Sequence, residues 1–107
     1  MIEKEVIYTG LESDGWEERL GGFSKLSYIH RITHNEGCGL FISLKDSYLA
    51  ISFVCWKGLK LNELETKIIK YKDLCEEFVP FINGQAEMIY RKGLNDIEVE
   101  KIKDDFE

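Results

Sequence analysis

Short runs of alternating apolar and polar residues dominate the first half of the chain. This two-residue period, together with many β-branched and aromatic residues, is typical of β-strands that are buried on one face. Glycine and small polar residues separate the runs, as expected for turns. The last of these runs is almost entirely apolar, which predicts a strand at the centre of the sheet. The predicted strands are residues 4–10, 23–34, 40–44 and 48–56, with a loop over 11–22 and a hairpin loop over 35–37.

The hydrophobic period changes after residue 61. Asn62 with Glu65 three residues later is typical of a helix-capping pair. Apolar residues then recur at steps of three and four, as on one face of a helix. This stripe consists of Leu64, Ile68, Tyr71, Cys75, Phe78 and Ile82. Because Pro80 disfavours helical geometry at the residue before it, a helix is predicted over 62–78.

The last quarter of the chain predicts two further elements. Asn83-Gly84 indicates the stop after a last helical turn, with a tight hairpin turn as the alternative. Residues 85–92 are predicted as a fifth strand. Asn95 begins a short closing helix whose buried stripe is Ile97, Val99, Ile102 and Phe106.

Together these elements predict a fold class and a core. The prediction is a single α+β domain over residues 1–107, with a mainly antiparallel sheet of about five strands and one long and one short helix packed on one face. The length suits one hydrophobic core that needs no metal or disulfide. The core candidates are Phe41, Leu49, Ile51, Phe53, Val54, Trp56, Ile68 and Met88.

The net charge of the chain indicates which kinds of molecule it can bind. The net charge is −6, from 20 acidic and 14 basic residues, and no basic run exceeds two residues. Nucleic-acid binding is therefore disfavoured, because it needs clustered Lys and Arg. Acidic groups beside an aromatic anchor indicate a surface that docks on a basic protein; the alternative is that the acids are solvated and Trp16 covers one end of the sheet. The predicted surface comprises Glu12, Asp14, Trp16, Glu17, Glu18, Asp104 and Asp105.

The chain carries no pattern for export or membrane insertion. Residues 1–10 lack a basic start followed by an apolar core, and no apolar run approaches the roughly 20 residues that cross a bilayer. We therefore expect a cytoplasmic protein with no membrane partner. The cysteines Cys38, Cys55 and Cys75 are expected to be reduced there.

The stretch "HRITHNEGCG" holds both histidines and one cysteine. On a strand, His30 and His34 would lie about 13 Å apart, too far to share one zinc ion. His34 and Cys38, by contrast, flank the predicted hairpin loop. Cross-strand neighbours lie about 5 Å apart, close enough for an imidazole to activate a thiol. His34 and Cys38 are the weak candidates for a catalytic pair, against the alternative of a plain polar turn. A metal site of His34, Cys38 and an acid stays open.

No phosphate loop, zinc-protease or nucleophile-elbow motif is present. The sequence is therefore interpreted as a binding protein without a cofactor, acting as an inhibitor or an immunity or anti-defence protein. One alternative is a small enzyme or ligand-binding protein that uses the His34 and Cys38 hairpin or a sheet face. Another is a structural subunit of a larger assembly. The oligomeric state is left open, with a homodimer as one alternative.

Overall fold

The computed structural model describes residues 2–19 and 21–106, and of residues 98–106 the helical backbone alone. Two helices and six strands make up the described part. Short 3₁₀ turns at Leu26–Tyr28 and Tyr71–Asp73 follow β2 and β6. The elements are α1 (Lys4–Ser13), β1 (Glu17–Arg19), β2 (Gly22–Ser24), β3 (Ile29–Thr33), β4 (Glu36–Leu44), β5 (Tyr48–Lys57), β6 (Lys60–Lys70) and α2 (Phe78–Phe106).

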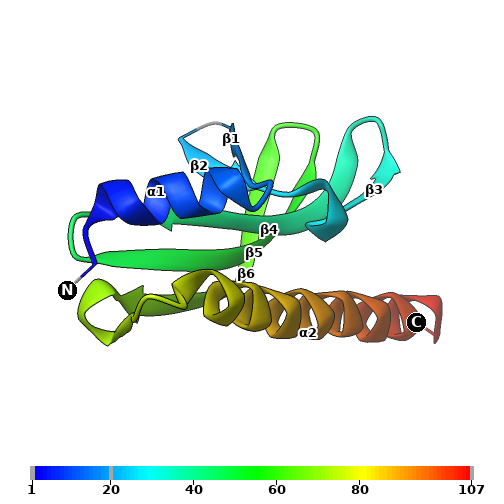
Figure 1. The fold of residues 1–107 in the computed structure, drawn as a ribbon. Coiled ribbons are helices and arrows are strands. Elements are labelled where there is room, and N and C mark those ends of the chain that lie inside the picture. Colours follow the sequence, from blue (N-terminus) through cyan, green and yellow to red (C-terminus); the bar gives the residue numbers. More distant parts are fainter. Residues whose placement is uncertain (1, 20, 107) are drawn as a thin grey trace.

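The strands form one antiparallel sheet in the order β1-β2-β4-β5-β6. β3 also pairs with β4, further along the edge that β2 uses. The short helix α1 and the long helix α2 lie together on one face of the sheet (Figure 1). The predicted α+β class, with a mainly antiparallel sheet and one long and one short helix on one face, is confirmed.

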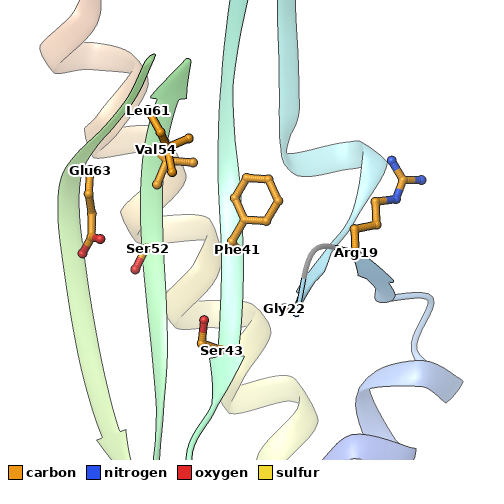
Figure 2. A pocket seen from close by; sticks show the side chains of 8 residues that line it. All are labelled: Arg19, Gly22, Phe41, Ser43, Ser52, Val54, Leu61 and Glu63. Atoms are coloured by element: carbon orange, nitrogen blue, oxygen red, sulfur yellow. The ribbon is translucent and has the colours of Figure 1, made fainter. Parts of the chain in front are cut away.

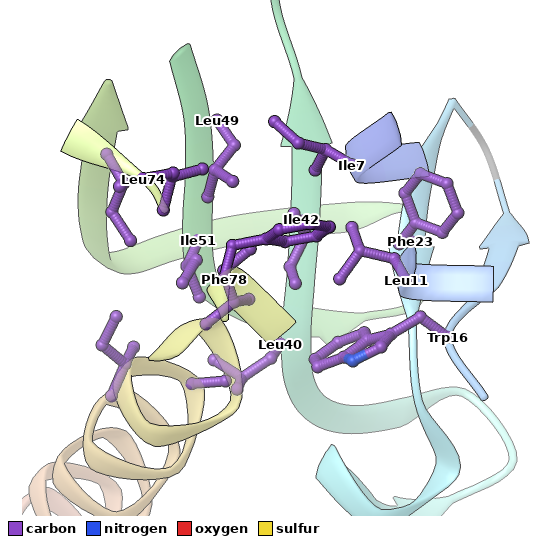
Figure 3. Packing of buried hydrophobic residues seen from close by; sticks show 14 of the residues in the cluster. Ile7, Leu11, Trp16, Phe23, Leu40, Ile42, Leu49, Ile51, Leu74 and Phe78 are labelled. Carbon is purple, nitrogen blue, oxygen red and sulfur yellow. The ribbon is translucent and has the colours of Figure 1, made fainter. Parts of the chain in front are cut away.

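The core lies between this face and the two helices (Figure 3). Every second residue of β4 and β5 points into it, which is the period of a strand buried on one face. α1 contributes Ile7 and Leu11, which are four residues apart and share a helix face. The central strands and α2 contribute Leu40, Ile42, Leu49, Ile51, Phe53, Phe78, Ile82 and Ala86.

Of the core candidates, Leu49, Ile51, Phe53 and Val54 are buried. Two others are wrong, since Ile68 and Met88 are largely exposed. The remaining two, Phe41 and Trp56, are half-buried on the face of the sheet that the helices leave uncovered.

The predicted first strand is wrong, because residues 4–10 belong to α1. β-branched residues favoured a strand there, but the buried pair Ile7 and Leu11 follows the helical period. Gly15, with φ +96°, lets the chain turn back after the helix. The loop predicted over 11–22 contains the end of α1, β1 and the start of β2.

The helix predicted over 62–78 is also wrong, because most of it is the edge strand β6. Only Ile69 of β6 is buried, so buried and exposed residues do not alternate along this strand. Its charged residues meet polar groups of α2: Lys92 Nζ lies 3.0 Å from a Glu65 carboxylate oxygen, and Lys67 donates to Gln85. Tertiary context thus overrides the apparent helical period.

The strand predicted over 85–92 is wrong as well, because α2 runs through it without a break. Pro80 is the third residue of α2, where its missing N–H has no intrahelical partner to lose. Asn83 is not a turn residue: it accepts a hydrogen bond from Trp16 Nε1 at 3.1 Å and donates one to Asp14 at 2.6 Å. The predicted closing helix is the end of this same α2.

No helix within the described residues combines the length and the apolar character needed to cross a membrane.

Candidate functional site

The hairpin that carries the histidines differs from its prediction. Thr33 pairs with Glu36, so the turn is His34-Asn35; the loop predicted over 35–37 is wrong, because it begins one residue late and Glu36 and Gly37 belong to β4. Cys38 is paired with His30 on one side and with Cys55 on the other. Cys38 belongs to the core, whereas His34 borders a hollow on the opposite face of the sheet. The structure therefore does not bring His34 and Cys38 together as a catalytic pair.

The environment of Cys38 also opposes nucleophilic chemistry. Burial raises the pKa of its thiol to about 11, and the neighbouring Cys55 thiol adds to the shift. A thiol with such a pKa is almost fully protonated at neutral pH, and the thiolate is the nucleophile. Among the described side chains, no group of three or more His, Cys, Asp or Glu could hold a metal ion.

Alkylation tests this placement. With iodoacetamide at pH 7.5, we expect exposed Cys75 to react first and Cys38 to stay largely unmodified, because its sulfur is buried and protonated. Peptide mass spectrometry measures the order of modification, and unfolding in guanidinium is the control in which all three cysteines react. Modification of Cys38 as fast as Cys75 in the folded protein would contradict the structure.

Trp16, predicted as an exposed anchor, is 1% exposed, so that interpretation is wrong. Its ring stacks on Tyr28 with centroids 5.6 Å apart, and Lys25 Nζ lies 5.6 Å from the ring centroid. The alternative that Trp16 folds back over the sheet is the one the structure shows. It is a packing residue that ties the segment after α1 to Asn83 of α2.

The predicted acidic residues divide into three groups. Asp14 is structural: the amide of Asn83 and the Lys25 ammonium, 3.1 Å away, hold the pKa of its carboxyl below the usual value. Glu12, Glu17 and Glu18 are exposed, and their role in partner binding stays a prediction. The side chains of Asp104 and Asp105 lie outside the described residues.

Two of the exposed acidic residues, Glu17 and Glu18, already interact with neighbouring side chains. Glu17 forms an ion pair with Arg19 at 2.7 Å. Glu18 accepts a hydrogen bond from the Tyr8 hydroxyl, which raises the pKa of Tyr8 to about 12 because the phenol proton is shared with a carboxylate.

The most distinctive surface is the uncovered face of the sheet. Figure 2 shows its side chains on β4, β5 and β6, with α2 behind the strands. Cross-strand pairing places Phe41 beside Ser52, Ser52 beside Thr66, and Trp56 beside Leu61. Here we call the apolar residues of this face the open-face patch. It consists of Phe41, Val54, Trp56, Leu61 and Ile68.

Two adjoining hollows deepen this face. One, of about 240 Å³, lies between Arg19 and Glu63 over the serines of β4 and β5 (Figure 2). The other, of about 340 Å³, lies beside Trp56 and is bordered by Arg31 and His34. Arg19, Phe41 and Leu61 line both. An apolar floor with a few polar groups at its rim is the usual composition of a binding site.

Sequence reasoning missed this face, although one signal pointed to it. Residues 48–56 are apolar on both sides of the strand, which indicates burial on both faces of a sheet. The helices cover only one face, so the apolar residues of the other are left for something else to cover. Arg19, Ser24 and Arg31 could not be assigned to it from sequence, because their positions depend on β2 and β3 sharing one edge of β4.

No protein-family model, curated protein or solved structure matches this chain. The geometry of the open face is therefore the basis for the functional proposal.

Proposed function

We propose that this protein acts by binding, as a small inhibitor or an immunity or anti-defence protein that docks on a protein partner through the open-face patch. The observation that carries the proposal is the apolar character of an uncovered sheet face. Leu61 and Ile68 are 69% and 59% exposed on it, beside Phe41, Val54 and Trp56. Contiguous exposed apolar surface rimmed by polar residues is typical of protein–protein contact sites.

The charge of the chain supports a basic partner. The net charge of −6 attracts a basic protein over long range and raises the rate of encounter. Acidic side chains also lie near the patch: Glu63 of β6 lines a hollow of the open face, and Glu17 of β1 is exposed. In this proposal the acids accelerate association, and the apolar patch supplies most of the binding free energy.

The two alternative functions are a small enzyme and a structural subunit, and the geometry of the sheet supports them unequally. An enzyme that uses His34 and Cys38 lacks the required juxtaposition, since the two residues lie toward opposite faces of the sheet. A structural subunit would cover the same open face. It would be distinguished by stoichiometric co-purification that does not respond to salt.

Charge insertion tests the docking face. Leu61→Lys and Ile68→Lys each place an ammonium on the open face, at two separate positions of the edge strand β6, where a docked partner would bury it. We expect each variant to weaken binding by at least about tenfold, because a charge would be buried in an apolar contact. Affinity for the partner captured from the native host is measured at low and at high salt, and we expect association to slow as salt rises.

Met88→Lys is the matched control, because Met88 is 65% exposed but lies on α2 in the helical layer. It adds the same charge and is expected to bind like the wild type. Thermal unfolding of all three variants checks that they are folded. If Leu61→Lys and Ile68→Lys bind as tightly as Met88→Lys, the open face is not the docking surface.

A further inference from the structure

The hollow beside Trp56 has the size and the lining of a small-molecule site. Its volume of about 340 Å³ falls within the range of ligand pockets in proteins. Ile29, Phe41, Trp56 and Leu61 provide apolar walls from four different strands. Three of these walls, Phe41, Trp56 and Leu61, belong to the open-face patch, whereas Ile68 does not line the hollow.

Trp56 is held in place at the wall of the hollow. Its ring occupies the space above Gly37, the residue opposite it on β4. A Cβ at position 37 would lie only 2.5 Å from Trp56 Cζ2, so glycine is what allows the indole to lie against the backbone. An aromatic wall fixed in this way is already ordered for a planar apolar group, which lowers the entropic cost of binding.

The titratable side chains that line this hollow are basic residues. They are Arg19, Arg31 and His34, and no carboxylate among the described side chains lines it. Arg19 is paired with Glu17, whereas Arg31 has no ion pair with any carboxylate among the described residues. In a chain of net charge −6, an apolar hollow bordered by an uncompensated guanidinium favours an anionic ligand.

A buried polar atom lies in the wall of the same hollow. Ser24 is 1% exposed, and its hydroxyl has no hydrogen-bond partner among the described residues. Phe23 points into the core, so its neighbour Ser24 belongs to the open side of β2, where it lines this hollow. Buried hydroxyls are normally satisfied, so an unpaired one at the wall of a pocket is available to a polar group of a ligand.

From these observations we propose that the hollow beside Trp56 binds a small organic carboxylate with a planar apolar body. The ring system lies against Trp56, Phe41 and Leu61, and the carboxylate accepts hydrogen bonds from Arg31. Ser24 supplies a further hydroxyl at the wall. This binding goes beyond protein docking, although the ligand would share Phe41, Trp56 and Leu61 with the docking surface.

Two probes test the proposal on the whole chain. 2-Naphthoate is titrated against the protein and followed by tryptophan fluorescence, in which Trp56→Phe identifies the responding indole. 2-Naphthalenemethanol has the same ring system without the charge. We expect saturable binding of 2-naphthoate and at least about tenfold weaker binding of the alcohol, because a charge-assisted hydrogen bond is lost.

Arg31→Gln is expected to reduce the affinity for 2-naphthoate at least about tenfold and to leave that for the alcohol unchanged. Arg91→Gln is the matched control, since Arg91 lies on α2 and pairs with Glu87. Ile68→Lys, which affects docking alone, should bind 2-naphthoate like the wild type. No saturation by 2-naphthoate, equal affinity for both probes, or equal affinity of Arg31→Gln and Arg91→Gln would each overturn the proposal.

Discussion

Trp16→Ala is expected to lower the free energy of unfolding by about 3–5 kcal/mol, the usual effect of deleting a buried aromatic side chain. The indole lies among core residues of α1 and β4 (Figure 3). Its removal leaves a cavity, ends the stacking on Tyr28, and leaves Asn83 Oδ1 without its indole donor. Urea unfolding followed by circular dichroism measures the change in midpoint.

Trp16→Phe is the matched variant, because it keeps an aromatic ring but removes the Nε1 donor. It should be less destabilising than Trp16→Ala. An unchanged unfolding midpoint for Trp16→Ala would contradict the buried position. Weakened partner binding at unchanged stability would instead restore the interpretation of Trp16 as an exposed anchor.

Gly93→Ala is expected to destabilise the protein by about 1–3 kcal/mol, although alanine is intrinsically the better helix former. At this point α2 passes directly over the central strand. A Cβ on residue 93 would lie 2.4 Å from ring atoms of Phe53, which is fully buried and has no room to move. The overlap outweighs the gain in helix propensity of about 1 kcal/mol.

Gly84→Ala in the same helix is the control. Its Cβ would meet nothing within 4 Å, so only helix propensity acts and the variant should be stabilised by up to about 1 kcal/mol. The two substitutions are therefore expected to shift the urea midpoint in opposite directions. A stabilising Gly93→Ala would mean that α2 does not pack closely on Phe53.

The fold class was predictable from the sequence, although several of its elements were not. β5 was recognisable because residues 48–56 are apolar except for Ser52, which indicates a central strand, and it does pair on both edges. Residues 4–10 were predicted as a strand but are helical, and residues 62–70 were predicted as helical but form a strand. The first error replaces a predicted strand by a helix, and the second replaces a predicted helix by a strand. The predicted fold class is therefore unchanged by the two errors together.

The causes of those errors are physical. β6 is an edge strand whose charged residues contact α2, so its alternation does not follow burial. Asn83-Gly84 has the composition of a turn, but Asn83 is used to join Trp16 and Asp14. Local composition cannot show a hydrogen bond between residues almost 70 positions apart.

The candidate site was less predictable than the fold. Its apolar floor could be anticipated from the two-sided apolar character of residues 48–56. Its rim could not, because Arg19, Ser24 and Arg31 reach the open face only through the shared edge of β4. The pairing of His34 with Cys38 failed because the turn is one residue earlier than predicted.

The most direct test of the open face as the contact surface is a methyl NMR spectrum of the protein with and without its captured partner. Isotope-labelled Ile, Leu and Val methyl groups report on both sides of the sheet. We expect the methyl signals of Val54, Leu61 and Ile68 to shift or broaden, and those of core residues Ile7 and Leu11 to change little. Shifts confined to residues of α1 and α2, with Leu61 and Ile68 unchanged, would contradict this expectation.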